Sequence, residues 1–348
     1  MTSATDFSAV HPEFAPFAAV FERELRPELE ALEAKRRAAW ARFLRWGLFC
    51  LLAAAVTAGI GAVLGWPRAV WFGFGGAGVL GVVALAMLGP LDGLTAKAKR
   101  LVLDAICAQL GLDYHAETGP PSALTRLQTY SLAPRYDRAA FFDALSGQRR
   151  GVRFTLTGAQ LEERRVETRV VNGRVKTEVR WVTVFLGQIL RLDYPHAFEG
   201  VTVLARDAGW FNAGSLAGGL KSVGFADPDF EKTFEVYASD QVAARALFDP
   251  MVQERFKALD ALFKNAQLRG VFDDGALTLA LQNDGRLELG DLKSGLAGPQ
   301  AAAGVLKEIA LVFDMIDLTT KRIDAILSGA VTIEAVRNAQ PEGSGAPE

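Results

Sequence analysis

The hydrophobic and polar residues follow different periods in different parts of the chain. Two uncharged runs, at 46–65 and 69–91, show no regular alternation with polar residues. A helix of about 20 apolar residues spans the hydrocarbon core of a bilayer. The pattern therefore predicts a transmembrane helical hairpin at 46–91, with Trp46 and Trp66 near the ends of the runs, where membrane proteins collect aromatic residues.

Basic residues flank this predicted hairpin on one side. Five precede the first run and three follow the second, whereas the connecting turn carries only Arg68. By the positive-inside rule both termini are expected in the cytoplasm. The chain is thus expected to be a multi-pass protein of the cell inner membrane, with the lipid bilayer as its partner. Small residues such as Gly61 and Gly65 favour packing of the two helices on each other, with homo-oligomer formation as the alternative.

Residues 1–45 read as an amphipathic N-terminal helical region. Apolar residues recur at three- and four-residue spacing through Phe14, Phe17 and Phe21, with charged residues on the other faces. Pro27 is expected to start a second helix or to kink the first one. This pattern favours a helix that packs on a soluble domain over one that lies on the bilayer surface.

A second group of segments follows the predicted hairpin. Residues 92–115 are predicted as a stalk helix, and residues 116–330 as a cytoplasmic domain that includes a C-terminal amphipathic helix at 300–327. The composition of residues 331–348 is typical of a disordered tail.

Alternation with a period of two appears within the predicted cytoplasmic domain. Long alternating runs lie on both sides of Asn172-Gly173, and shorter ones lie around Asp274-Gly275. Both dipeptides favour the tight turn of a β-hairpin. One helix is expected at 241–264. The predicted fold class is α+β: an N-terminal helix, a two-helix transmembrane hairpin, a stalk helix, and an antiparallel β-rich cytoplasmic domain with packed helices.

Overall charge and cysteine content exclude several classes of site. The formal charge of −2 gives no reason to expect nucleic acid as a partner. Cys50 lies in an apolar run and Cys107 in a helical segment, so neither predicts a disulfide framework or a metal pair. No cofactor is expected.

Charge is unevenly distributed within the first predicted hairpin. Between Arg149 and Arg191 there are ten bases and four acids. Such a surface favours contact with anionic lipid headgroups or with a protein partner, and an ordinary solvated hairpin with cross-strand ion pairs is the alternative. The residues selected for this contact are Arg149, Arg150, Arg153, Arg164, Arg165, Arg169, Arg174 and Lys176.

Few residues suggest catalysis. Asp193, Tyr194 and His196 are close in sequence, but Pro195 favours a turn that leaves a sheet over an acid–base cluster. Asp227 and the acids that follow it are too few for a calcium-binding loop and favour a solvated turn. No catalytic motif is recognised, which favours a non-enzymatic protein.

Five short segments have sequences similar to those of a known protein family. They are FERELRPELEALEAKRR at 21–37, RYDR at 135–138, SG at 146–147, DYPHAFEGVTVL at 193–204, and FEVYASDQVAARALFDPMVQERF at 234–256. The F-x-V-Y-x-x-D…A-R pattern in the last segment is the most specific. Together they resemble a bacterial family of two-pass membrane proteins that carries a cytoplasmic domain of unknown function. The resemblance implies the membrane topology and supplies no reaction, cofactor or catalytic residue.

Three functions remain open from the sequence. The leading expectation is a membrane-anchored cytoplasmic interaction or scaffolding module. The first alternative is a domain that binds a lipid or small ligand at the inner membrane, in a cleft between sheet and helix. The second is an uncharacterised hydrolase, which only a cleft with clustered acids and bases would favour.

Overall fold

The structure is a computed structural model. It describes residues 6–63, 89–171, 174–195, 200–206, 219–262, 267–283, 287, 295 and 297–328. The chain divides into two compact units. Unit 1 contains residues 1–109 and 288–307, and unit 2 contains residues 110–287 and 308–348. The predicted domain limits at 45, 91, 115 and 330 remain predictions.

Unit 1 is helical in its described part. A short 3-10 helix (Pro12–Phe14), α1 (Phe17–Val20) and one π-helical turn (Phe21–Leu25) precede α2 (Arg26–Val63). The wide π turn ends just before α2, and Pro27, which has no N–H to donate, is the second residue of α2. Pro27 therefore lies where the sequence predicts a helix start. The predicted apolar stripe is buried, and Phe17 and Phe21 both contact the ring of Phe7.

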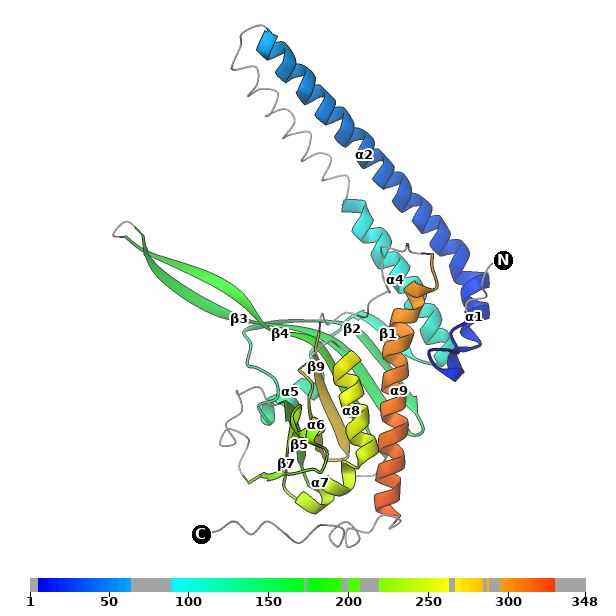
Figure 1. Ribbon diagram of the computed structural model, residues 1–348, viewed down its shortest axis with the longest axis vertical. Helices are drawn as coiled ribbons and strands as arrows, with labels where there is room; N and C mark the ends of the chain where they lie inside the picture. Colours follow the sequence, from blue (N-terminus) through cyan, green and yellow to red (C-terminus); the bar gives the residue numbers. More distant parts are fainter. Residues whose placement is uncertain are drawn as a thin grey trace. The chain divides into compact units, whose positions relative to one another are not determined.

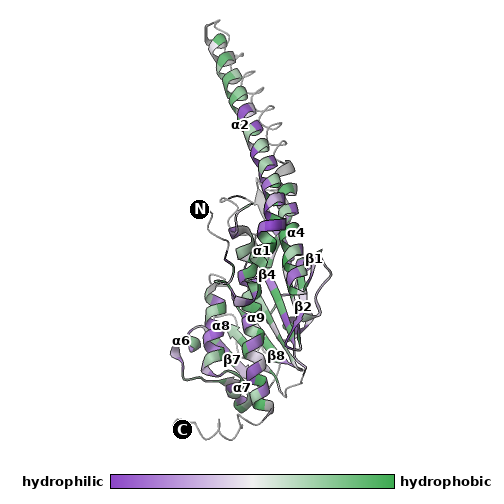
Figure 2. Ribbon diagram, turned by 90° about the vertical axis from the view of Figure 1, so that its right-hand side faces the viewer, coloured by the Kyte–Doolittle hydropathy of each residue, from purple (hydrophilic) through white to green (hydrophobic). Residues whose placement is uncertain are grey.

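The predicted transmembrane hairpin is wrong. In the part of the chain that the structure describes, no helix is long and apolar enough to cross a membrane. Residues 46–63 are instead the second part of the single helix α2, whose first part, 26–45, is rich in charged residues (Figure 2). The apolar stretch therefore belongs to a mixed helix. Residues 64–88, which hold most of the second predicted span, lie outside the described residues, and α4 (Gly89–Leu110) follows.

An antiparallel sheet forms the centre of unit 2 (Figure 1). Its described strands lie in the order β1-β2-β3-β4-β9-β8-β5-β7-β6, and each neighbouring pair is antiparallel. The predicted antiparallel domain is confirmed. The strands are β1 (Asp113–Glu117), β2 (Arg138–Arg149), β3 (Val152–Val171), β4 (Arg174–Asp193), β5 (Thr202–Arg206), β6 (Lys221–Val223), β7 (Phe234–Ala238), β8 (Arg269–Asp273) and β9 (Ala276–Gln282).

Both predicted hairpins are confirmed by strand register. In the first, Val171 pairs with Arg174 on either side of the predicted Asn172-Gly173 turn, which lies outside the described residues. In the second, Asp274 and Gly275 have φ angles of 51° and 71°, as a type I′ turn requires. These turns join the long strands β3 and β4 and the buried strands β8 and β9.

Helices cover both faces of the sheet. On one face, α5 (Ser122–Thr129) buries Leu124 and Leu127 against β3, β4 and β9. On the other, α8 (Pro250–Leu262) and α9 (Gln300–Leu327) pack with Leu259 and Met315 beside Leu190 of β4. The sheet is thus the middle layer of unit 2.

The structure has two helices where the sequence predicts a single helix at 241–264. The structure has α7 (Gln241–Leu247) and α8, separated at Phe248 and Asp249 because Pro250 disfavours helical geometry at the residue before it. The short helix α6 (Pro228–Glu231) precedes β7. The C-terminal helix α9 has the predicted limits.

Candidate interaction surface

The strands β3 and β4 extend beyond the rest of the sheet as a two-stranded ribbon (Figure 1). The neighbouring strand β2 pairs with β3 only as far as Glu162, and β9 pairs with β4 only from Gly187 onward. Residues 163–171 and 174–182 therefore pair only with each other within the described sheet. These two segments are called the ribbon below.

A β-bulge marks the root of the ribbon. The register shifts between Leu161 and Glu162, which pair with Phe185 and Thr183, so that Val184 is the extra residue on β4. A bulge bends the strands and increases their twist. The ribbon therefore leaves the plane of the sheet at this point.

Glu162, at the root of the ribbon, forms several side-chain contacts. Its carboxylate forms an ion pair with Arg138 and accepts a hydrogen bond from the Gln160 side chain at 3.2 Å. The hydrogen bond from Arg138 lowers the pKa of Glu162 below its usual range, against the opposing effect of burial. The Arg138 guanidinium also lies 4.1 Å from the ring centroid of Trp181. These contacts hold the start of the ribbon in place.

One face of the ribbon is largely apolar and exposed. Cross-strand register places the pairs Val166–Val179 and Thr168–Thr177 and the pair Arg164–Trp181 on the same face. Val166 is 56% exposed, Val179 50% and Trp181 38%. This set is called the apolar face. A sheet normally covers such β-branched and aromatic pairs with a helix or a second sheet.

The opposite face carries like charges in direct opposition. Arg165 pairs with Arg180, and Glu167 pairs with Glu178. Like charges directly across two strands destabilise the pairing. Arg165 also forms a 3.0 Å ion pair with Glu163 on its own strand. An isolated two-stranded hairpin is marginally stable in water.

The eight bases selected from the sequence fall into two groups. Arg149, Arg150 and Arg153 lie at the β2–β3 turn, and the other five lie in the ribbon. Between Arg153 and Arg169 a strand extends about 50 Å at ~3.3 Å per residue. The structure therefore does not bring the eight residues together. For Arg169, Arg174 and Lys176 it gives the register alone, with Arg169 opposite Lys176.

The group at the β2–β3 turn has an acidic partner on α9. Arg149 and Arg150 form ion pairs with Asp317 at 2.7 and 2.8 Å, and Arg149 is stacked 4.4 Å from the Phe313 ring. Burial alone raises the pKa of Asp317, but the hydrogen bonds and charges of the two arginines outweigh it, and the pKa lies below the ordinary value. These two bases therefore serve the packing of unit 2.

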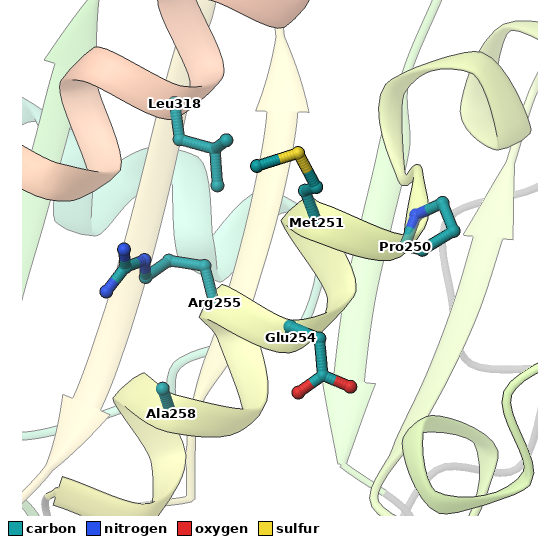
Figure 3. Close-up of a pocket in the computed structure, with 6 residues that line it drawn as sticks. All are labelled: Pro250, Met251, Glu254, Arg255, Ala258 and Leu318. Atoms are coloured by element: carbon teal, nitrogen blue, oxygen red, sulfur yellow. The ribbon is translucent and has the colours of Figure 1, made fainter.

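An open groove lies between α8 and α9 (Figure 3). It has a volume of about 470 Å³, and the thioether of Met251, which is 68% exposed, lies beside Leu318. The two charged residues that line it form ion pairs: Arg255 with Asp314 at 3.2 Å and Glu254 with Lys257 at 2.7 Å. The groove therefore offers an apolar strip between ion pairs that are already formed.

Among the described residues, little space is left between β4 and the helices α8 and α9. The cavity between β4 and α9, lined by Leu190, Val312 and Met315, has a volume of about 10 Å³, enough for one water molecule. The sequence-based alternative of a ligand cleft between sheet and helix requires a pocket of several hundred cubic ångströms. The packed helices fill this position.

The acids considered for catalysis have structural contacts. The Tyr194 hydroxyl is buried and donates to Thr319 Oγ1 at 2.7 Å, and Asp193 pairs with Arg191. His196 lies outside the described residues. Asp227 caps α6 and pairs with Lys257 at 2.7 Å, which lowers the pKa of Asp227. Among described residues, no group of three or more potential ligands is arranged to hold a metal ion.

Two further partly buried polar clusters lie near the sheet. Burial and a hydrogen bond to Asp273 raise the pKa of Tyr130 to about 12, and Arg126 pairs with the same carboxylate at 2.6 Å. Burial raises the pKa of Asp260, partly offset by the charge of Arg206 at 3.2 Å. Both clusters are ion pairs that join separate elements of unit 2.

Sequence reasoning selected the charges of the ribbon and missed its apolar face. The signal was present in the alternation of Val166 and Thr168 on β3 and of Thr177, Val179 and Trp181 on β4. Alternation alone does not show whether another element covers a face. That information comes from the register of β2 and β9.

Comparison with known proteins covers part of unit 2. Residues 183–320 match a family model described as "Protein of unknown function (DUF3137)". The match begins at the root of the ribbon and ends within α9. It supports the expected domain of unknown function, and it gives no support to the two-pass membrane character of the resembled family.

No protein in the curated set matches by sequence. A solved structure with some similarity is described as the "crystal structure of the mycobacterial trehalose monomycolate transport factor A, TtfA". It is 14% identical, over 63% of this chain and 94% of that chain, with a TM-score of 0.33. A similarity at this level carries no argument about fold or function.

Proposed function

We propose that the chain is an interaction module that binds a partner surface through the apolar face of the β3–β4 ribbon. The observation that carries the proposal is the exposure of Val166, Val179 and Trp181 on a ribbon that no other strand of the described sheet supports. Full burial of such side chains gives roughly 1.5–3 kcal/mol each. Covering the half-exposed set therefore yields about 1 kcal/mol per side chain and stabilises the ribbon.

Cysteine labelling tests whether the ribbon is covered in the cell. Val179→Cys is introduced in a chain whose buried Cys50 and Cys107 are replaced by alanine. A small membrane-permeant maleimide is applied to intact cells and to the purified chain. We expect labelling at position 179 to be at least tenfold slower in cells. Lys232→Cys is the matched control, because the Lys232 side chain is 75% exposed and lies away from the ribbon.

The result that contradicts the proposal is equal labelling of position 179 in cells and in the purified chain, with the Lys232→Cys control also unchanged. The ribbon is then open to solvent in the cell, and no partner covers its apolar face.

A further inference from the structure

We propose that the partner of the ribbon is an anionic lipid surface. This inference rests on the proposed function and names the class of surface that the ribbon binds. It is carried by the charge, area and side-chain composition of residues 163–182.

The ribbon is positively charged. Residues 163–182 contain six bases and three acids, a net charge of +3 in a chain whose overall charge is −2. Arg164, Arg165 and Arg180 are exposed in the structure. Positive charge concentrated on one projecting element favours a negative surface, and anionic headgroups attract such segments within a Debye length of the bilayer.

Each face of the ribbon has a small area. Nine residues per strand give a face about 30 Å long, and two strands make it about 10 Å wide, or roughly 300 Å². A stable protein interface buries about 800 Å² on each partner. The ribbon face alone is therefore too small for a stable pair of proteins, including two copies of this chain. A membrane has no such limit, because its headgroups surround every exposed base.

The apolar face has side chains of the kinds found where lipid headgroups meet water. Trp181 and Arg164 form a cross-strand pair at the root, and Val166 and Val179 form a pair farther out. Tryptophan and arginine both combine an apolar body with a polar or charged end, and tryptophan is enriched where lipid headgroups meet water. Strand register places Arg164 on the apolar face and the other five bases on the opposite face. An element of this kind lies in the interface with its apolar face toward the acyl chains and its basic face among the headgroups.

Vesicle flotation with the full-length chain tests the inference. The chain is mixed with vesicles of phosphatidylcholine alone and with vesicles that contain about 30% phosphatidylglycerol, near the ~0.1 M salt at which screening is moderate. The measured quantity is the ratio of bound fractions on the two vesicle types. We expect anionic lipid to increase binding at least tenfold for the unmodified chain.

Two charge-reversal variants, one in the ribbon and one outside it, test whether the ribbon is the lipid-binding site. The ribbon variant is Arg164→Glu, Arg165→Glu and Arg169→Glu, and we expect it to lose the preference for anionic vesicles. The control variant is Lys221→Glu, Lys232→Glu and Lys321→Glu, which changes the charge equally at exposed positions outside the ribbon and is expected to keep the preference within twofold. Circular dichroism melting of both variants checks that they are folded.

Two outcomes overturn the lipid inference: no preference for anionic vesicles in the unmodified chain, or an equal preference in the ribbon variant. Cysteine labelling then separates the two proposals. If Val179→Cys is still protected in cells, the ribbon has a protein partner and the proposed function stands. If it is not protected, both proposals fail.

Discussion

Gly187 shows at the scale of one residue how closely β4 and β9 approach each other. A Cβ at this position would clash with the carbonyl oxygen of Leu281 and lie 2.9 Å from the Cα of Gln282. Both obstacles are backbone, which cannot move without disturbing the β4–β9 pairing. Gly187 therefore sets where β4 enters the sheet, a few residues from the root of the ribbon.

We expect Gly187→Ala to lower the free energy of unfolding by about 2–3 kcal/mol, in the upper range for overpacking. Gly119→Ala is the control, because no atom lies within 4 Å of the added Cβ and the position does not require positive φ. Chemical denaturation measures both. A change below about 0.5 kcal/mol for Gly187→Ala would show that β4 and β9 are farther apart than described.

Asp317 gives a prediction about pH. Its folded pKa is lowered by Arg149 and Arg150. A carboxylate with a lowered folded pKa contributes stability that is fully present above the unfolded value, near ~3.9, and is lost as the pH falls through the folded pKa. We expect Asp317→Asn to cost about 1–2 kcal/mol at pH 7. The difference from the unmodified chain should shrink as the pH falls below about 4.

Asp314→Asn is the control for this measurement. Asp314 lies one turn earlier on α9, and its ion pair with Arg255 is more exposed, at 35% and 38%. Exposed pairs contribute about 0–1 kcal/mol. Equal losses for the two variants, or a loss at Asp317 that does not depend on pH, would contradict the assigned ion pair.

At the scale of the element, the ribbon is expected to be separable from the fold. Replacement of residues 166–179 by Asn-Gly keeps Arg165 opposite Arg180, a pair with the same parity as Val171–Arg174 at the natural turn. Because the deleted part pairs with no other described strand, we expect the domain to fold with a melting temperature within a few degrees of the original. Failure to fold would show that the ribbon belongs to the core.

The sequence predicts elements well where a local signal decides them. Asn172-Gly173 and Asp274-Gly275 predict both hairpins, and the apolar stripe predicts the limits of α9. The strand β1, with the sequence DYHAE, has no apolar alternation and was not predicted, because its place depends on pairing with β2. The helix α5 was missed for the same reason, since its apolar side is defined by contact with the sheet.

The candidate surface depends on contacts between distant residues and is harder to predict. Arg149 and Arg164 look equivalent in sequence, yet Arg149 is neutralised by an acid 168 residues away on α9. Composition identifies a basic segment, but it does not show which bases are used within the fold. The prediction of one basic contact surface is therefore replaced by a basic ribbon and a separate structural ion-pair cluster.

At the scale of the whole molecule, the described chain has an antiparallel sheet domain, which contains the match to a family of unknown function, and an N-terminal helical region. The matched family range, 183–320, covers β5 to β9, the second half of β4, α8 and part of α9. The whole ribbon, 163–171 and 174–182, lies outside this range. Its role as the binding element is thus an inference from geometry and charge.

A cysteine scan along residues 177–181 tests the central claim most directly, because it asks which face of the ribbon is covered. Side chains alternate between faces along a strand. In cells we predict slow maleimide labelling at 177, 179 and 181, on the apolar face, and fast labelling at 178 and 180, on the charged face. Uniform labelling at all five positions, or protection of 178 and 180 instead, would contradict the assignment of the apolar face as the binding surface.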